Sequence, residues 1–228
     1  MTPAFAVVLE PRTVYRVART PHAWGWPDWA HAEPDGTFGN RWDDPDGIFR
    51  VLYACSERVG AFVETLARFR PSAALIAGLE AIAGDDDTLP PGTVPASWRG
   101  DRTIGVARIN GHFVDIGRAE SLATLNYMLA GRLAHYRLRE LDAAAIRSQA
   151  PRRLTQEISR LIYEQTTPDG QPAYAGIFYR SRLGDDLNNW AIFERDRVDI
   201  ALEPDTDINP DDEDFRAAIR LLGLRLVG

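Results

Sequence analysis

The chain has 228 residues, of which 45% are hydrophobic and 26% are charged, a composition typical of a globular protein. A net charge of −7 argues against a nucleic-acid-binding protein driven by phosphate attraction, although it leaves room for a local basic pocket. No apolar run is long enough to span a membrane, and the single cysteine, Cys55, excludes an internal disulfide and a multi-cysteine metal site. We therefore expect one domain over residues 1–228, located in the reducing environment of the cytoplasm.

All 26 basic residues of the chain are arginines, which the base composition of a genome can explain. The absence of lysine excludes Schiff-base chemistry and a phosphate-loop lysine. Any phosphate group must therefore be held by arginine forks or by backbone amides.

The first part of the chain predicts strands on either side of a tryptophan-rich loop. Apolar patterning predicts strands at residues 1–10, 12–19 and 48–54. Residues 1–10 lack the basic flank of a secretion signal. The loop at residues 21–42 holds Trp24, Trp26, Trp29 and Trp42, and so many indole rings either pack the loop down or line a cleft.

A helix is predicted to follow the third strand. The turn at residues 44–47 leads into that strand. Ser56 then caps a helix that runs to about residue 70. The core stripe of this helix is Val59, Phe62, Val63 and Leu66.

The middle of the chain predicts helices and one hairpin. Residues 71–83 form an apolar helix candidate, and the acidic, proline-containing residues 85–98 a loop. Residues 103–109 and 113–116 form a hairpin around an Asn110-Gly111 turn. Helices are expected at residues 118–139 and 153–165.

In the last part of the chain the pattern again predicts strands. They are predicted at residues 173–179, 190–194 and 198–202. An acidic first turn opens a final helix whose apolar face is expected in the core, formed by Phe215, Ala218, Ile219 and Leu222. Strands at both ends with helices between them predict an α+β fold with a mixed or antiparallel sheet.

Two charged residues are the first candidates for chemistry. Glu64 lies on the helix face away from the core stripe, where it either pairs with Arg68 or acts as a carboxylate that stabilises an oxocarbenium-like transition state. The small residues Gly60, Ala61 and Ala67 share that face and allow a ligand to approach. Arg41 either pairs with one of the aspartates that follow it or grips a pyrophosphate.

Four further residues complete the candidate site. Arg16 lies mid-strand, where it faces water or, if the strand is internal, an anion such as a ligand. Tyr53 belongs to the core or stacks on a nicotinamide or adenine ring. Ser181 is a turn residue or a hydrogen-bond donor to substrate, since no nucleophile elbow surrounds it. Asn189 places an amide nearby or belongs to a polar turn.

Other constellations do not predict a site. His22 and His31 lack a third metal ligand at suitable spacing. The acidic run at residues 85–87 lacks the alternating ligands of a calcium loop. Gly105 and Gly111 do not form a dinucleotide fingerprint. We expect no bound metal and no cofactor.

The order of motifs along residues 12–194 resembles the RES-domain family. The motifs are Tyr15-Arg16-Val17, Gly39-Asn40-Arg41-Trp42, Tyr53-Ala54-Cys55 with Glu64, Gly176-Ile177-Phe178-Tyr179-Arg180-Ser181, and Asn189-Trp190-Ala191-Ile192-Phe193. The family takes its name from an arginine, a glutamate and a serine, which Arg41, Glu64 and Ser181 match. Arg16 and Tyr53 match further residues of the family's pocket.

The resemblance implies a fold similar to that of ADP-ribosyltransferase toxins, with a split sheet and flanking helices. It implies NAD as substrate, either cleaved by water or phosphate or used to ADP-ribosylate a target. Glu64 would then stabilise the ribose cation, Arg41 and Arg16 bind the pyrophosphate, and Tyr53 and Ser181 place the substrate. Many members are toxins neutralised by a helical antitoxin with an Xre-like region. A nucleotide-binding module without catalysis and a docking protein remain alternatives, and a homo-oligomer is compatible with the sequence.

Overall fold

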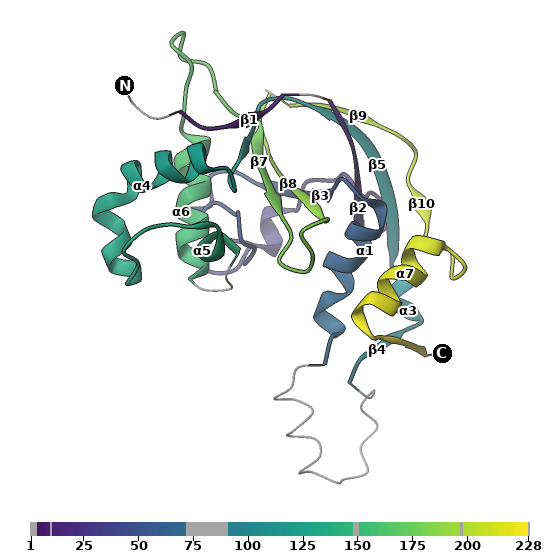
Figure 1. The fold of residues 1–228 in the computed structure, drawn as a ribbon. Helices are drawn as coiled ribbons and strands as arrows, with labels where there is room; N and C mark the ends of the chain where they lie inside the picture. The colour runs from purple at the N-terminus through teal and green to yellow at the C-terminus, as the bar shows by residue number, and fades with distance from the viewer. Residues whose placement is uncertain (1–3, 10, 72–90, 148–150, 197, 228) are drawn as a thin grey trace.

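The fold is a curled, mixed β-sheet with helices packed on it, an α+β architecture (Figure 1). The computed structural model describes residues 4–9, 11–71, 91–147, 151–196 and 198–227. Strands from the two ends of the chain meet in one sheet, and most of the helical residues come from the segments between them.

Eleven strands lie in the described part of the chain. They are β1 (Val7–Val8), β2 (Arg12–Arg19), β3 (Val51–Cys55), β4 (Thr93–Pro95), β5 (Arg102–Asn110), β6 (Phe113–Asp115), β7 (Gly176–Arg180), β8 (Asn188–Phe193), β9 (Asp199–Leu202), β10 (Thr206–Asp207) and β11 (Arg225–Val227). The main sheet has the order β1-β6-β7-β8-β3-β2-β5-β10, with β9 also paired to β5. All its pairs are antiparallel except β6 with β7, and β4 and β11 form a separate parallel pair.

Six α-helices lie in the described residues, in two groups at opposite ends of the sheet (Figure 1). They are α1 (Arg58–Leu66), α3 (Ser97–Gly100), α4 (Ala119–Leu133), α5 (Ala143–Arg147), α6 (Arg152–Tyr163) and α7 (Glu213–Leu222). Short 3₁₀ turns are η1 (Trp29–His31), η2 (Ala67–Phe69) and η3 (Ala134–Tyr136). None of the helices in these residues is long and apolar enough to cross a lipid bilayer.

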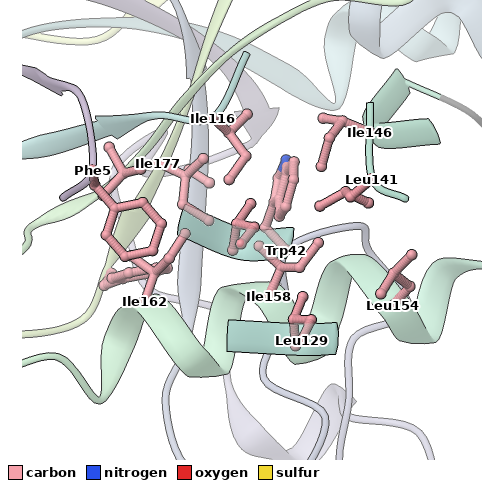
Figure 2. Close-up of a cluster of buried hydrophobic side chains, with 14 of the residues drawn as sticks. Phe5, Trp42, Ile116, Leu129, Leu141, Ile146, Leu154, Ile158, Ile162 and Ile177 are labelled. Atoms are coloured by element: carbon pink, nitrogen blue, oxygen red, sulfur yellow. The ribbon is translucent and has the colours of Figure 1, made fainter. Parts of the chain in front are cut away.

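The first helical group, α4 with α5 and α6, buries a cluster around Trp42 (Figure 2). The indole of Trp42 is completely buried, and Ile158 of α6 and Leu129 of α4 lie beside it in the same cluster. Strand residues Ile177 and Phe193 close the cluster from the sheet side. The end of the tryptophan-rich loop is therefore part of the core.

The second helical group, α1 with α7, packs on the other end of the sheet. Phe215 of α7 contacts Phe62 of α1 edge-on at 5.6 Å and stacks on Trp98 of α3 at 6.0 Å between ring centroids. Asp212 caps α7, since its carboxylate accepts hydrogen bonds from the backbone amides of residues 214 and 215. The apolar face predicted for this helix is confirmed: Phe215, Ala218 and Leu222 are buried and Ile219 is partly buried.

A third cluster fills the opposite face of the curled sheet. Leu52 and Ala54 of β3 point into it, while the alternate residues of the same strand point toward the helices. Trp24 packs here against Gly105, where an added Cβ would lie 2.5 Å from the indole nitrogen of Trp24. Since Trp24 and Trp42 are both buried and Trp29 is exposed, the tryptophans mainly pack the loop down.

The sheet is split between β2 and β3. These neighbours pair at one position alone, Tyr15 opposite Cys55. In contrast, β2 pairs with β5 at eight positions and β3 with β8 at five. On the helix-facing side of β3, Tyr53 packs against the cluster of the first helical group, whereas Cys55 belongs to the cluster of the second.

Two sequence predictions are corrected by the strand topology. The hairpin over residues 103–116 is wrong, because β5 pairs with β2 whereas β6 pairs with β1 and β7. In the sheet order, β7, β8, β3 and β2 lie between β6 and β5. The loop predicted at residues 85–98 is also wrong at its end, where β4 pairs with the distant β11 and α3 follows.

The helix start predicted at Ser56 is wrong as well. The N-cap of α1 is Glu57, and the hydroxyl of Ser56 instead accepts a hydrogen bond from the indole of Trp190 at 2.8 Å. The α-helix ends at Leu66 and continues as η2. The helix predicted at residues 71–83 lies almost wholly outside the described residues. The strand at residues 12–19 is confirmed with its predicted ends.

Replacement of Phe215 by alanine should destabilise the protein by about 3–5 kcal/mol, because it removes a completely buried ring between two aromatic neighbours. Urea unfolding monitored by circular dichroism measures this change. Leu221→Ala on the same helix is the control, since Leu221 is 68% exposed and its loss should change the unfolding free energy by less than about 0.5 kcal/mol. Equal effects of the two changes would contradict this packing.

Candidate functional site

A cavity of about 480 Å³ opens at the split between β2 and β3. This volume lies within the range of small-molecule sites. Five residues that the sequence singled out line it: Arg16, Arg41, Tyr53, Glu64 and Asn189. The sixth, Ser181, lies behind Glu64 and contacts it.

The carboxylate of Glu64 is held at the cavity wall by two buried side chains. Its Oε1 accepts a hydrogen bond from the hydroxyl of Ser181 at 2.5 Å and another from the amide of Asn189 at 2.8 Å. Within the described residues, no donor bonds Oε2. The carboxylate therefore has one fixed oxygen and one oxygen available to a ligand.

Ser181 and Asn189 are both 2% exposed, and both are held in turn by further hydrogen bonds. The hydroxyl of Ser181 accepts from the backbone amide of Leu183 at 2.9 Å. The amide oxygen of Asn189 accepts from the thiol of Cys55 at 2.9 Å. Asn189 lies in β8 opposite Tyr179 of β7, just before Ser181. The two donors therefore reach Glu64 from one rigid part of the sheet.

The surroundings of Glu64 bear on one of the alternatives raised by the sequence, its pairing with Arg68. No ion pair links Glu64 to Arg68 in the described chain, where the guanidinium of Arg68 lies over the ring of Phe69. Ala61 lines the cavity, as its small size allows. Gly60 does not face the cavity, because an added Cβ there would meet Cys55 at 3.3 Å. The part of the Glu64 face of α1 that is open to the cavity is therefore smaller than the sequence indicated.

Arg16 lies in an internal strand, and its side chain bridges the split between β2 and β3. Its Nε donates to the carbonyl of Ala23 and its NH1 to the carbonyl of Tyr53, both at 2.7 Å. Burial lowers the pKa of Arg16 to about 10, so the guanidinium remains charged at neutral pH. Arg16 thus brings a positive charge to the lining of the cavity.

Arg41 is carried by a loop that Tyr53 fixes. The hydroxyl of Tyr53 accepts from the backbone amide of Trp42 and donates to Asp43, both at 2.9 Å. Asp43 also accepts from the amide of Asn40 at 2.6 Å. Burial raises the pKa of Tyr53 well above its ordinary value, so the phenol stays protonated and can donate this bond. Tyr53 is both a cavity wall and an anchor for the loop.

The electrostatic surroundings of Arg41 include other groups of the site. Burial lowers the pKa of Arg41, with the nearby charge of Arg182 acting in the same direction and Glu64 opposing it. Of the aspartates that follow Arg41, Asp44 bonds the amide of Ile48 and pairs with Arg160. The guanidinium of Arg41 lies 5.9 Å from the centre of the Trp42 ring.

The match to a known family rests on nearly the whole chain. A family model for the RES domain matches residues 13–216. The chain belongs to the RES-domain family. This family is generally associated with NAD-related toxin function. Searches of curated proteins and of solved structures give no significant match.

The structure also places at the cavity residues that the sequence analysis did not name as candidates. Three of them lie outside the motifs: Thr65, Arg152 and Arg182. The others stand in the motifs but were given no role there: Tyr15, Val17, Gly39, Asn40, Ala54, Cys55 and Tyr179. Arg182 follows Ser181 directly and Tyr179 precedes it by two residues, so their position next to the Ser181 motif was a signal that could have identified them. Arg152 comes from the first position of α6, and only the tertiary structure brings it to the cavity, where it donates to the carbonyl of Gly39.

The charge of the cavity is strongly positive. Four guanidinium groups line it, those of Arg16, Arg41, Arg152 and Arg182, against the single carboxylate of Glu64. Arginine forks match the geometry of phosphate oxygens. Among the described residues, histidine, cysteine and acidic side chains form no group of three that could hold a metal ion. The arrangement suits an anionic ligand that brings a cationic or cation-forming centre to Glu64.

Removal of the Tyr53 hydroxyl should destabilise the protein by about 1–3 kcal/mol, because Tyr53→Phe leaves the Trp42 amide and the Asp43 carboxylate without this partner. Chemical denaturation measures the loss. Tyr15→Phe is the matched control: Tyr15 also lines the cavity, but its hydroxyl has no hydrogen bond within the described chain, so a change below about 0.5 kcal/mol is expected. Comparable losses in both variants would show that the bridge does not hold the loop.

Proposed function

We propose that this RES domain cleaves the bond between nicotinamide and ribose in NAD. The observation that carries the proposal is the fixed carboxylate of Glu64 in a cavity lined by four arginines. NAD combines a pyrophosphate, which arginine forks bind, with a ribose carbon that becomes cationic when the bond to nicotinamide breaks. The family's association with NAD supports the same substrate.

The pyrophosphate of NAD would bind to Arg41, with Arg16, Arg152 and Arg182 contributing charge. Bidentate contacts to phosphate are stronger than neutral hydrogen bonds and fix orientation. The aromatic side chains of Tyr53 and Tyr179 line the same cavity and offer surfaces against which the nicotinamide can pack. The anion and the ring are thereby fixed on either side of the ribose.

Bond cleavage then follows from the charge of Glu64. The C1–N bond breaks with its electron pair going to the nicotinamide nitrogen, so nicotinamide leaves as a neutral base and needs no general acid. Positive charge develops on C1 and O4 of the ribose. The free Oε2 of Glu64 stabilises that charge directly or by accepting a hydrogen bond from the 2′-hydroxyl.

A nucleophile completes the reaction at C1. Water gives ADP-ribose and releases a proton, inorganic phosphate gives ADP-ribose 1″-phosphate, and a protein side chain gives an ADP-ribosylated target. Hydrolysis or phosphorolysis is the reaction proposed, with transfer to a protein as the alternative. NAD enters as substrate, and no metal or other cofactor takes part in the scheme.

Ser181 acts in this scheme as a positioning residue. Its hydroxyl hydrogen is directed to Oε1 of Glu64, and its oxygen is held by the amide of Leu183. Asn189 shares that task through its amide. Both residues would therefore affect the rate through the orientation of Glu64.

The wider assignment follows the family. The split sheet with a helical group at each end fits an ADP-ribosyltransferase-like fold. A NAD-consuming enzyme in a cell suits the toxin of a toxin–antitoxin pair, whose partner would be an antitoxin with an Xre-like region. A cytoplasmic location gives access to NAD, and assembly into a homo-oligomer is compatible with the proposal.

Glu64→Gln should reduce the kcat for NAD consumption by about 10²-fold or more, because it removes the charge but keeps an oxygen for Ser181 and Asn189. Incubation with NAD, with and without phosphate, followed by chromatography measures nicotinamide and identifies its partner product. ADP-ribose indicates hydrolysis, its 1″-phosphate phosphorolysis, and labelled protein transfer.

The control for this experiment is Glu140→Gln. Glu140 is exposed and remote from the cavity lining, so its replacement should leave turnover unchanged. Full NAD consumption by the Glu64→Gln protein would overturn the mechanism. NAD binding without any nicotinamide release by the parent would instead support a non-catalytic binding module.

Arg41→Gln should raise the KM for NAD by about 10- to 100-fold, because a charge-assisted contact to the pyrophosphate is lost. Steady-state kinetics over a range of NAD concentrations measures this effect separately from kcat. Arg180→Gln is a nearby control, since that side chain is exposed and donates to the carbonyl of Asp185 outside the cavity lining. A KM unchanged by Arg41→Gln would remove Arg41 from the pyrophosphate site.

A further inference from the structure

A second basic cavity lies beyond the first, at the far ends of β2 and α1. Its volume is about 540 Å³. Three arginines line it: Arg19 at the end of β2, Arg68 in η2, and Arg102 at the start of β5. It shares no lining residue with the cavity that holds Glu64.

The sheet places two of these arginines directly opposite each other. Arg19 and Arg102 are register partners in the β2–β5 pair. Like charges at directly opposed positions of an antiparallel pair repel each other. Arg68 adds a third positive charge from the neighbouring helix end, so the fold concentrates repulsion at this point.

None of the three guanidinium groups forms an ion pair within the described residues. The only carboxylate lining the cavity is that of Asp101, which no hydrogen bond or ion pair connects to them in that part of the chain. Elsewhere the chain pairs its arginines readily, as Arg58 does with Asp212 at 2.5 Å. Among the described lining residues, three positive charges therefore face one negative charge, and the excess suits an anionic ligand.

Arg102 is built into the wall of this cavity. It is 8% exposed, its NH1 donates to the carbonyl of Trp98 at 3.1 Å, and its guanidinium lies 4.8 Å from the centre of the Trp98 ring. Burial lowers the pKa of Arg102, the charges of Arg68 and Arg19 act in the same direction, and the charge of Asp101 opposes them. The indole nitrogen of Trp98 is also buried, with no acceptor in the described chain.

We propose that this second cavity binds a phosphate-type dianion, either inorganic phosphate or the phosphate group of a monoester. A tetrahedral dianion offers oxygen atoms to several guanidinium forks at once. It would neutralise the repulsion between Arg19, Arg68 and Arg102, and it would bind to side chains that lie outside the NAD cavity. The site goes beyond the proposed NAD cleavage and does not depend on it.

The test is calorimetric titration of the full chain with inorganic phosphate, against sodium chloride of equal ionic strength. Arg19→Gln and Arg68→Gln alter exposed side chains and should each weaken phosphate binding by about fivefold or more. The double variant should lose the phosphate bound at this cavity, which is separate from phosphate that enters the NAD cavity as a nucleophile. Because repulsion is relieved, these variants should have a melting temperature in phosphate-free buffer no lower than that of the parent.

Arg99→Gln is the matched control, since Arg99 belongs to α3 but does not line the cavity. Its dissociation constant for phosphate should equal that of the parent. A parallel titration with adenosine monophosphate distinguishes the sources: tighter binding than phosphate, lost in the double variant, assigns a monoester, and the reverse order assigns the free anion.

Two results would overturn the proposal. One is a parent protein that binds neither anion at millimolar concentration. The other is a double variant whose dissociation constant stays within about twofold of that of the parent, which would place phosphate in the NAD cavity instead.

Discussion

The hydrogen bond from Arg16 to the carbonyl of Tyr53 is the contact on which the site depends. Where β2 and β3 separate, their backbone groups lose sheet partners, and a buried carbonyl without a donor is costly. A neutral donor could satisfy that carbonyl, but a guanidinium also brings a charge into the gap. The split thus creates the cavity and supplies part of its positive charge in one interaction.

The other half of the sheet positions the opposing negative charge, that of Glu64. Glu64 comes from α1, but its orientation is set by Ser181 and Asn189 at the ends of β7 and β8. The three family residues are therefore unequal in what they do: the arginine and the glutamate face the cavity, and the serine acts on the glutamate. The motifs led us to expect Ser181 on the substrate, and only the tertiary structure shows its hydroxyl bonded to Glu64.

Local patterns were sufficient for much of the fold. The strand at residues 12–19 and the capped helix α7 follow from alternation and from an acidic first turn, both of which are local signals. The hairpin failed because Asn110-Gly111 is a good local turn signal, whereas the long-range pairing of β5 with β2, and of β6 with β1 and β7, separates the two strands. Strand β4 was missed because its partner lies at the other end of the chain.

In the candidate site, too, local sequence signals identify some residues but not those that long-range packing brings in. Arg41, Glu64 and Asn189 were found through ordered motifs, whereas Arg152 has no motif and reaches the cavity only through the packing of α6. The sequence shows which face of the helix Gly60 lies on, but it does not show that Cys55 packs against that position. Gly60 was therefore expected to be open to a ligand.

Trp42 joins Arg41 to the hydrophobic interior. One residue grips the cavity and the next is completely buried among side chains of α4 and α6, such as Leu129 and Ile158. The evolutionary freedom of that interior is therefore coupled to the cavity: a volume change at a buried position such as Leu129 or Ile158, which does not line the cavity, shifts the backbone that carries Arg41. Substitutions in the two places should show epistasis, and lineages that alter the ligand site should carry compensating changes in the helical layer behind it.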